Sequence, residues 1–449
     1  MTTFPQGWTV GLSDVLTASS HGVAPVSGPR YWWGGPLDVE GLALGSTRVA
    51  ATALQALTGK VFTVSAERVA ASFASLENLR VDGRQPQGFA PLSGFRRTAD
   101  GWIRLHANYP HHEEALKRAM QASSPHAVAV ALASSKSTDA ERAITEAGGV
   151  AASVKTREEW QSSADGSAAS TGPWLRFLGS EDGKARRTSW RMSNGHAAHP
   201  LHGLRILDLT RVVAGPSASR LLAALGADVL RVDPPDYPEL TDLHIDTGFC
   251  KRSIELDFKR PAHLKTFHGL LRDCHVIVLG YRPRALERFG LAPQALLERW
   301  PALKVVSFNA WGFEHSAGQQ RGFDSIVQAA CGIADIYRKA DGSPGSLPVQ
   351  ALDHATGMGV VAAVALLLAD DQHAHAQASL ARTAHELLNL SPVPSTREAV
   401  EALEVPTREV HTSAYGLLQH VPPPLLMESE SLEYSRGPVR YGSSEPSWL

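Results

Sequence analysis

The chain has few cysteines, and their arrangement builds neither a metal site nor a disulfide framework. Its three cysteines, Cys250, Cys274 and Cys331, lie far apart and form no C-x-x-C pair. Sparse cysteines without paired spacing are typical of proteins from a reducing compartment. The sequence therefore argues against a zinc ribbon or a disulfide-stapled secreted fold and predicts a cytoplasmic protein.

Long apolar runs and an excess of charge are also missing. The longest apolar run, residues 357–369, has 13 residues, whereas a membrane-spanning helix needs about 20. Lys plus Arg (43) nearly balances Asp plus Glu (45), which leaves a formal net charge of −2. Such a balance gives no global field toward nucleic acid or anionic lipid. We expect a buried core helix at this run and no nucleic-acid or membrane partner.

Motifs of several common enzyme classes are absent. The sequence contains no G-x-S-x-G, no P-loop and no G-x-G-x-x-G, which argues against serine hydrolases of that type, nucleotide kinases and typical dinucleotide-binding enzymes. Three histidines, His196, His199 and His202, recur at three-residue spacing, but no cysteine or acidic cluster accompanies them. No metal site is therefore expected.

The composition that is present is that of a folded globular protein. Hydrophobic residues make up 43% of the 449 residues and charged residues 20%, and a chain of this length is expected to hold two or three domains. We expect a small α+β region over 1–160, a linker over 161–200, a catalytic sheet domain over 201–390, and a C-terminal extension over 391–449 that wraps over the surface.

After residue 200, short β-rich runs alternate with helical ones. The expected strands cover residues 204–209, 228–232, 275–279 and 303–308, and the expected helices, each opening with a proline, cover 216–225, 261–271 and 293–300. This alternation predicts a doubly wound parallel sheet of the α/β class. Elsewhere the patterns predict a helix, a strand and a helix over 43–79, a hairpin over 95–105, and one or two helices over 356–390.

Ligands of open α/β sheets bind beyond the carboxyl ends of the strands, so the residues that follow each strand are candidates. The turn at 210–217 offers helix amides and Arg211 to a phosphate, and Asp233 lies at about the spacing of a ribose-binding acid. An ordinary strand-to-helix turn explains the same residues. The basic residues that follow further strands gather around a polyanion or lie on a solvated face; they are Lys251, Arg252, Arg282, Arg284, Arg288 and Arg321.

Asp353 precedes the most apolar stretch of the chain and has two interpretations. As a helix N-cap it would accept backbone amides, which would lower its pKa. Alternatively, it is a carboxylate nucleophile that attacks an activated acyl carbon.

Several sequence blocks occur together in a fixed order. They are residues 202–216, 225–235, 251–257, 281–283, 286–291, 321–330 and 353–357. Read together, these blocks resemble the family III CoA-transferases, the CaiB/BaiF group. The resemblance covers about 170 residues, from 201 to 369, with a fainter match at 88–105.

The resemblance implies an enzyme that moves coenzyme A from an acyl-CoA to a carboxylic acid, with no permanently bound cofactor. The acid at the position of Asp353 would attack the thioester, giving a mixed anhydride and then an aspartyl-CoA thioester. By the same match, the residues at the CoA would be Arg211, Val212, Ala214, Phe249, Lys251, Tyr281, Arg288 and Arg321. The implied architecture is a Rossmann-like doubly wound sheet domain with a smaller α+β domain, in an interlocked homodimer.

Two departures from the family pattern leave other functions open. The small-domain segment here precedes the sheet domain, and Gly83–Gly88 is a thin substitute for the family's glycine-rich loop. The related acyl-CoA racemases use a histidine where this chain has Phe323, which cannot take a proton. A racemase, a non-catalytic CoA-ester-binding subunit and an NAD-dependent enzyme remain as alternatives.

Overall fold

The computed structural model describes residues 22–30, 32–179, 188–192, 196–314, 320–369, 372–390 and 403–449, without the side chains of residues 411 and 412. Parts of the expected linker and of the expected C-terminal extension lie outside the described residues.

A seven-stranded sheet forms the centre of the molecule. Its strands, in spatial order, are β10 (Arg252–Glu255), β9 (Asp228–Asp233), β8 (Arg205–Leu209), β11 (Val276–Leu279), β12 (Lys304–Asn309), β13 (His373–Ser379) and β7 (Arg176–Gly179). All neighbours are parallel except β13 and β7. The chain runs outward from β8 to β9 and β10 and then returns to β11 on the other side of β8. The predicted mixed α/β class with a large, mainly parallel sheet is confirmed.

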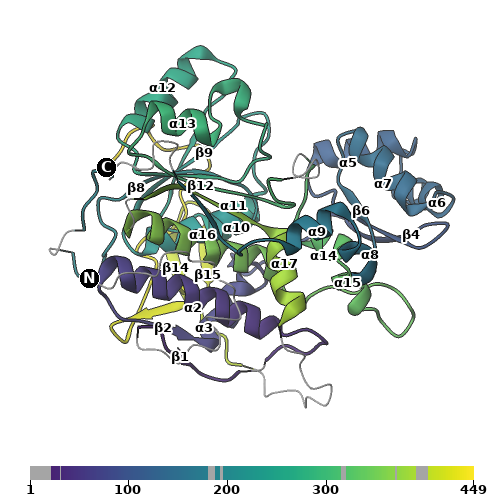
Figure 1. Ribbon diagram of the computed structural model, residues 1–449, viewed down its shortest axis with the longest axis horizontal. Helices are drawn as coiled ribbons and strands as arrows, with labels where there is room; N and C mark the ends of the chain where they lie inside the picture. The colour runs from purple at the N-terminus through teal and green to yellow at the C-terminus, as the bar shows by residue number, and fades with distance from the viewer. Residues whose placement is uncertain are drawn as a thin grey trace.

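Helices cover both faces of this sheet (Figure 1). One face carries α10 (Ala214–Ala224) and α16 (Ala351–Ala369), with α2 (Val39–Thr58) packed against α16, and the other carries α12 (Pro261–Arg272) and α13 (Pro293–Arg299). Among the described helices, only α16 is long and apolar enough to cross a membrane, and 94% of that stretch is buried. Because α16 lies between α10, α2 and the sheet, it needs no polar face.

A smaller lobe projects to one side of the sheet (Figure 1). It consists of β4 (Gly94–Arg97), β5 (Trp102–Leu105), β6 (Ala151–Ser153), α5 (Pro110–Ala119), α6 (Pro125–Ala133) and α7 (Ser137–Glu146). Strands β4 and β5 form the predicted hairpin, with Arg97 opposite Trp102. The lobe has its own apolar core, which includes Ile103, Leu105 and Leu132.

The remaining described elements complete the fold around the large sheet, its covering helices and the smaller lobe. They are β1 (Val26–Ser27), β2 (Phe62–Ser65), α3 (Ala66–Phe73), α4 (Ser75–Asn78), β3 (Arg80–Val81), α8 (Arg157–Gln161), α9 (Ala164–Ser170), α11 (Thr241–Thr247), the 3-10 helix at Glu287–Phe289, α14 (Asp324–Ala330), α15 (Ile333–Ile336), α17 (Leu380–Asn389), β14 (Arg408–Ser413), β15 (Gly416–His420), β16 (Leu425–Met427) and β17 (Glu430–Ser431).

The structure differs from the expected domain boundaries in three places. In the expected small region 1–160, α2 packs on α16 and β2 pairs with β16, so this part belongs to the main body. In the expected linker 161–200, α9 is followed by β7, which completes the large sheet. In the expected C-terminal extension, four short strands form. All three differences arise from long-range packing that local sequence patterns do not report.

Candidate active site

A cavity of about 410 Å³ opens where the strand order reverses between β8 and β11. Its described lining is Tyr109, His111, His112, Arg211, Val212, Pro234, Tyr237, Gly280, Tyr281, Arg282, Phe308, Asn309, Ala310, Gln320, Arg321, Gly322, Phe323, Asp353 and Leu380. Such a reversal leaves a crevice at the carboxyl ends of the strands, because the two flanking crossovers lie on opposite faces. The cavity therefore lies at the place where an open α/β sheet binds its ligand.

Asp353 is a buried carboxylate without a protein partner. Only 6% of the residue is exposed, and within the described part of the chain its carboxylate accepts no hydrogen bond and forms no ion pair. The residue lies inside the first turn of α16, and its own N–H donates to the Asp324 carboxylate at 3.0 Å. Asp324 thus takes the capping role that the sequence left open for Asp353.

Burial and mutual repulsion keep both carboxyls weakly acidic. Burial, followed by the negative charge of Asp324, raises the pKa of Asp353 well above its usual range. Burial also raises the pKa of Asp324, although the backbone amide of Asp353 and the Gln328 amide oppose that shift. A carboxylate of high pKa is a stronger nucleophile once it is ionised. This is the opposite of the low pKa that a capping role would give.

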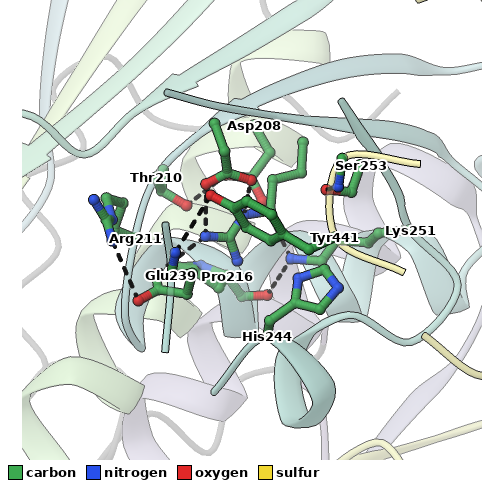
Figure 2. Close-up of polar contacts among 12 residues, drawn as sticks. Asp208, Thr210, Arg211, Pro216, Glu239, His244, Lys251, Ser253 and Tyr441 are labelled. Atoms are coloured by element: carbon green, nitrogen blue, oxygen red, sulfur yellow. Dashed lines mark hydrogen bonds and ion pairs between the residues drawn. The ribbon is translucent and has the colours of Figure 1, made fainter. Parts of the chain in front are cut away.

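Glu239, which Figure 2 shows beside Arg211, connects the smaller lobe to the turn after β8. Its buried carboxylate accepts a hydrogen bond from the Tyr109 hydroxyl at 2.5 Å, and it pairs with Arg231 at 3.0 Å and with Arg211 at 3.6 Å. Burial raises the pKa of Glu239, but the Arg231 and Arg211 guanidinium groups outweigh it and bring the value to about 2. Glu239 is therefore a permanent anion that fixes one wall of the cavity.

Arg211 lies between this anion and an aromatic ring. Its guanidinium donates to the Pro238 carbonyl at 2.8 Å and lies 4.8 Å from the centre of the Tyr109 ring. Burial alone would lower its pKa, but Glu239 and the neighbouring acidic groups raise it above the usual value. The side chain that the sequence offered to a phosphate is thus held at the cavity wall by Glu239.

Val212 adopts a backbone conformation that is unusual for its residue type. Its φ is +66°, in the left-handed region, which a β-branched side chain rarely enters. The strained amide N–H donates to the Glu239 carboxylate at 2.9 Å. Such strain persists only where the surroundings over-determine the backbone, and it is common at functional sites.

Three of the predicted CoA-contacting residues line neither this cavity nor the one that adjoins it. Lys251 is buried and donates to the Asp208 carboxylate at 3.2 Å, to Ser219 at 2.9 Å and to the Pro216 carbonyl at 3.1 Å (Figure 2). Burial lowers its pKa to about 8. Phe249 is fully buried between His420 and Tyr434, and Ala214 begins α10 with 1% exposed. Lys251 therefore ties β10 to β8 and α10.

The other predicted residues lie together. Arg211, Val212, Tyr281, Arg321 and Asp353 all line the 410 Å³ cavity. Tyr281 also lines an adjoining cavity of about 460 Å³, which contains Arg284, Arg288 and Lys259. The two cavities share Tyr281 and Arg282 in their linings, and we call them together the groove. Its far part carries both basic side chains and the carboxylates of Asp233, Asp236 and Asp257.

Two further residues that the sequence offered to a ligand form ion pairs within the protein. Arg252 pairs with Asp228 at 2.8 Å, and Asp233 pairs with Arg231 at 2.7 Å in the buried network around Glu239. Asp233 is therefore not free to bind a ribose. Among the described residues, no group of His, Cys, Asp and Glu side chains could hold a metal ion, and His196 stacks on His202 with ring centres 3.7 Å apart.

Sequence reasoning missed the contribution of the smaller lobe. Tyr109 and His112 reach the cavity from the start of α5, and His106, which follows β5, stacks on Phe323 with ring centres 3.7 Å apart. The only local signal is the pair His111-His112 beside Glu113 and Glu114, a pattern that is most simply a polar helix start. These residues lie more than 240 positions before Asp353, so only the folded chain brings them to it.

Comparison with known proteins finds similarity over the sheet domain. The sequence profile of CoA-transferase family III matches residues 201–419. A human succinyl-CoA:glutarate CoA-transferase is 30% identical over 194 residues, which are 40% of this chain and 44% of that protein. A formyl-CoA:oxalate CoA-transferase of Streptomyces coelicolor is 31% identical over 208 residues, 44% of this chain and 50% of that one.

The likeness to solved structures is partial. A crystal structure of a hypothetical protein from Mycobacterium tuberculosis has a TM-score of 0.39 and 28% identity, covering 42% of this chain and 57% of that one. A CaiB/BaiF family protein from Brucella suis has a TM-score of 0.38 and 20% identity, covering 49% and 65%. The chain spans about half the length of the curated relatives it matches. Residues 201–419 of the chain therefore resemble CoA-transferase family III.

Proposed function

We propose that this protein transfers coenzyme A from an acyl-CoA to a carboxylic acid through a covalent intermediate on Asp353. The observation that carries the proposal is the carboxylate itself, which is buried, has no partner among the described residues and lines the cavity at the strand reversal. A buried carboxylate kept out of ion pairs is suited to attack a thioester. The relatives named as CoA-transferases support the same chemistry.

The proposed reaction has four steps on one carboxyl group. An Asp353 oxygen bonds to the thioester carbon and the C–S bond breaks, giving a mixed anhydride and the CoA thiolate. The thiolate attacks the Asp353 carbonyl carbon, and the donor acid leaves with that Asp353 oxygen. The acceptor carboxylate then displaces the thiolate from the aspartyl-CoA thioester. Finally the thiolate attacks the acceptor carbonyl, which releases the new acyl-CoA and the Asp353 carboxylate.

The groove supports this order of groups along an acyl-CoA. We place the acyl end at Asp353, the pantetheine chain beside Tyr281 and the phosphates near Arg284 and Arg288, which line the adjoining cavity. Arg321 lines the Asp353 cavity without an ion-pair partner among the described residues, so it would bind the carboxylate of the acceptor acid. The strand order, which reverses at this groove, supports our proposal that the large sheet is Rossmann-like.

Trapping the intermediate tests the proposal. The protein is mixed with acetyl-CoA, succinyl-CoA or formyl-CoA, then treated with hydroxylamine and analysed by peptide mass mapping. We expect a hydroxamate on Asp353 and none in Asp353→Asn, because the amide is not a nucleophile. Asp324→Asn serves as the matched control, since its side-chain oxygen can still accept the Asp353 N–H and labelling should persist.

Two outcomes would contradict the proposal. Labelling that is equally strong in Asp353→Asn would move the nucleophile elsewhere. Tight binding of all three esters without any modified Asp353 would favour a CoA-ester-binding protein. Oxygen exchange gives an independent check, because one ¹⁸O atom of a labelled donor acid should reach Asp353 when the transfer runs in reverse.

A further inference from the structure

We propose that His112 is a further catalytic residue, which donates a hydrogen bond from Nε2 to the acyl oxygen while Asp353 attacks the thioester. The inference rests on the proposed function and adds a residue from the smaller lobe to it. His112 lines the same cavity as Asp353 and is 4% exposed. Its ring also contacts Phe323, with centres 5.9 Å apart, and Phe323 directly precedes Asp324, the acceptor of the Asp353 amide.

The imidazole of His112 is unpartnered within the described part of the chain. Its Nδ1 is fully buried and has no hydrogen-bond partner, and Nε2 forms no hydrogen bond with any described residue. A buried donor without an acceptor is costly, so a proton on Nδ1 would be disfavoured. The neutral ring therefore keeps its proton on Nε2, where a ligand oxygen can accept it.

The surroundings of the ring keep it neutral. Burial, followed by His111, His106, Arg321 and Arg211, lowers the pKa of His112 to about 2. A ring with so low a pKa is a weak base, but it remains a hydrogen-bond donor throughout the neutral range. A neutral imidazole can stabilise a developing oxyanion in this way without gaining or losing a proton.

Two other uncharged donors near the cavity are already engaged, and we have placed Arg321 at the acceptor carboxylate. The Val212 N–H donates to Glu239 at 2.9 Å, and the Asn309 side-chain amide donates to the Gly312 carbonyl at 3.0 Å. When Asp353 attacks, the thioester carbonyl oxygen gains negative charge as the new C–O bond forms, and a donor must meet it. His112 supplies that donor, and the negative charge leaves with the thiolate when the C–S bond breaks.

The test separates chemistry from binding. The rate of Asp353 labelling by acetyl-CoA and succinyl-CoA is measured in the wild type, His112→Leu and His112→Gln, with the affinity for S-ethyl-CoA, a thioether without the acyl oxygen. We expect His112→Leu to slow labelling by about 100-fold, as for loss of one oxyanion donor, with unchanged thioether affinity. His112→Gln, whose amide nitrogen can occupy the place of Nε2, should regain much of the rate. The exposed His126→Gln on α6 is the matched control.

A spectroscopic measurement covers the case in which His112→Leu does not fold. In Asp353→Asn labelled with ¹⁵N-histidine, the His112 signals, assigned with His112→Gln, should show a neutral Nε2–H ring from pH 5 to 8. Acetyl-CoA should shift the Nε2–H proton downfield, and S-ethyl-CoA should not. A proton on Nδ1, or equal shifts with both ligands, would overturn the inference.

The remaining outcomes are equally distinct. Wild-type labelling rates in a folded His112→Leu, or an equal fall in rate and thioether affinity, would reject the catalytic role and leave the Asp353 mechanism standing. Deuterium exchange at the α-carbon of propionyl-CoA that requires His112 would show a base and overturn the donor role. If the wild type is never labelled at Asp353, the proposed function itself fails.

Discussion

At the scale of single residues, the site depends on a carboxylate that destabilises the fold when it ionises. Burial and Asp324 raise the pKa of Asp353 well above its usual range. An acid whose pKa is higher in the folded chain contributes its full stability below the unfolded pKa and loses it as the pH rises through the folded pKa. We therefore expect Asp353→Asn to raise the melting temperature, and to raise it more at pH 8 than at pH 5.

Differential scanning fluorimetry at both pH values checks this expectation. The gain at pH 8 should be a few degrees, which corresponds to roughly 1–2 kcal/mol of relieved desolvation and repulsion. Asp139→Asn, on the exposed side of α7, is the matched control and should change stability by less than about 0.5 kcal/mol at either pH. A gain that shrinks as the pH rises would show that Asp353 ionises at an ordinary pH.

At the scale of elements, the turn from β8 into α10 carries strain beside the site. At ordinary backbone angles alanine is more stabilising than glycine by about 0.5–1 kcal/mol, whereas a left-handed residue with a side chain costs roughly 1–2 kcal/mol. Because Val212 has a φ of +66°, we expect Val212→Gly to be more stable than Val212→Ala by about 0.5–1 kcal/mol. Urea unfolding of both variants measures the difference.

The adjacent residue provides the control for this comparison. Val213 has a φ of −113°, so the order should reverse and Val213→Ala should be more stable than Val213→Gly. If alanine were favoured at both positions, the left-handed turn at Val212 would be contradicted. The hydrogen bond from the Val212 N–H to the Glu239 carboxylate would then not explain why Glu239 lies at the cavity wall.

The same scale shows what the sequence could predict. The observed bounds of strands β8, β9, β11 and β12 agree with the predicted bounds within one or two residues. They could be predicted because buried parallel strands are locally apolar. Strand β13 (His373–Ser379) was predicted to be helical, although its alternating alanines face the core and signal a strand. The rule for strand ends predicted Arg211 and Arg321, and the family resemblance predicted Tyr281; all three line the cavity with Asp353.

Other parts of the site had no local signal. Tyr109 and His112 are brought to Asp353 by packing of the smaller lobe, and their sequence neighbours give no indication of it. Lys251, which the family resemblance places at the CoA, forms a buried ion pair with Asp208, and no local pattern indicates that pair. Long-range packing and buried ion pairs are the two features that a single sequence does not report.

At the scale of the whole molecule, segments near the two ends of the described chain cover parts of the sheet domain. Helix α2 covers α16 on one face, and the last residues lie along β10, the edge strand. The Ser444 N–H donates to the Ser253 carbonyl at 2.8 Å, and the Trp448 indole donates to the Leu270 carbonyl at 3.0 Å. An uncovered edge strand is a template for pairing with another chain.

We therefore expect deletion of residues 442–449 to destabilise the protein and to promote association through β10. Loss of the Trp448 packing alone should lower the free energy of unfolding by about 2 kcal/mol or more, and the exposed edge should add concentration-dependent light scattering relative to the full chain. Trp448→Phe, which keeps a ring in place but loses the indole N–H, should lose less stability and should not scatter. A truncated chain with the unfolding midpoint and mass distribution of the full chain would show that β10 needs no cover.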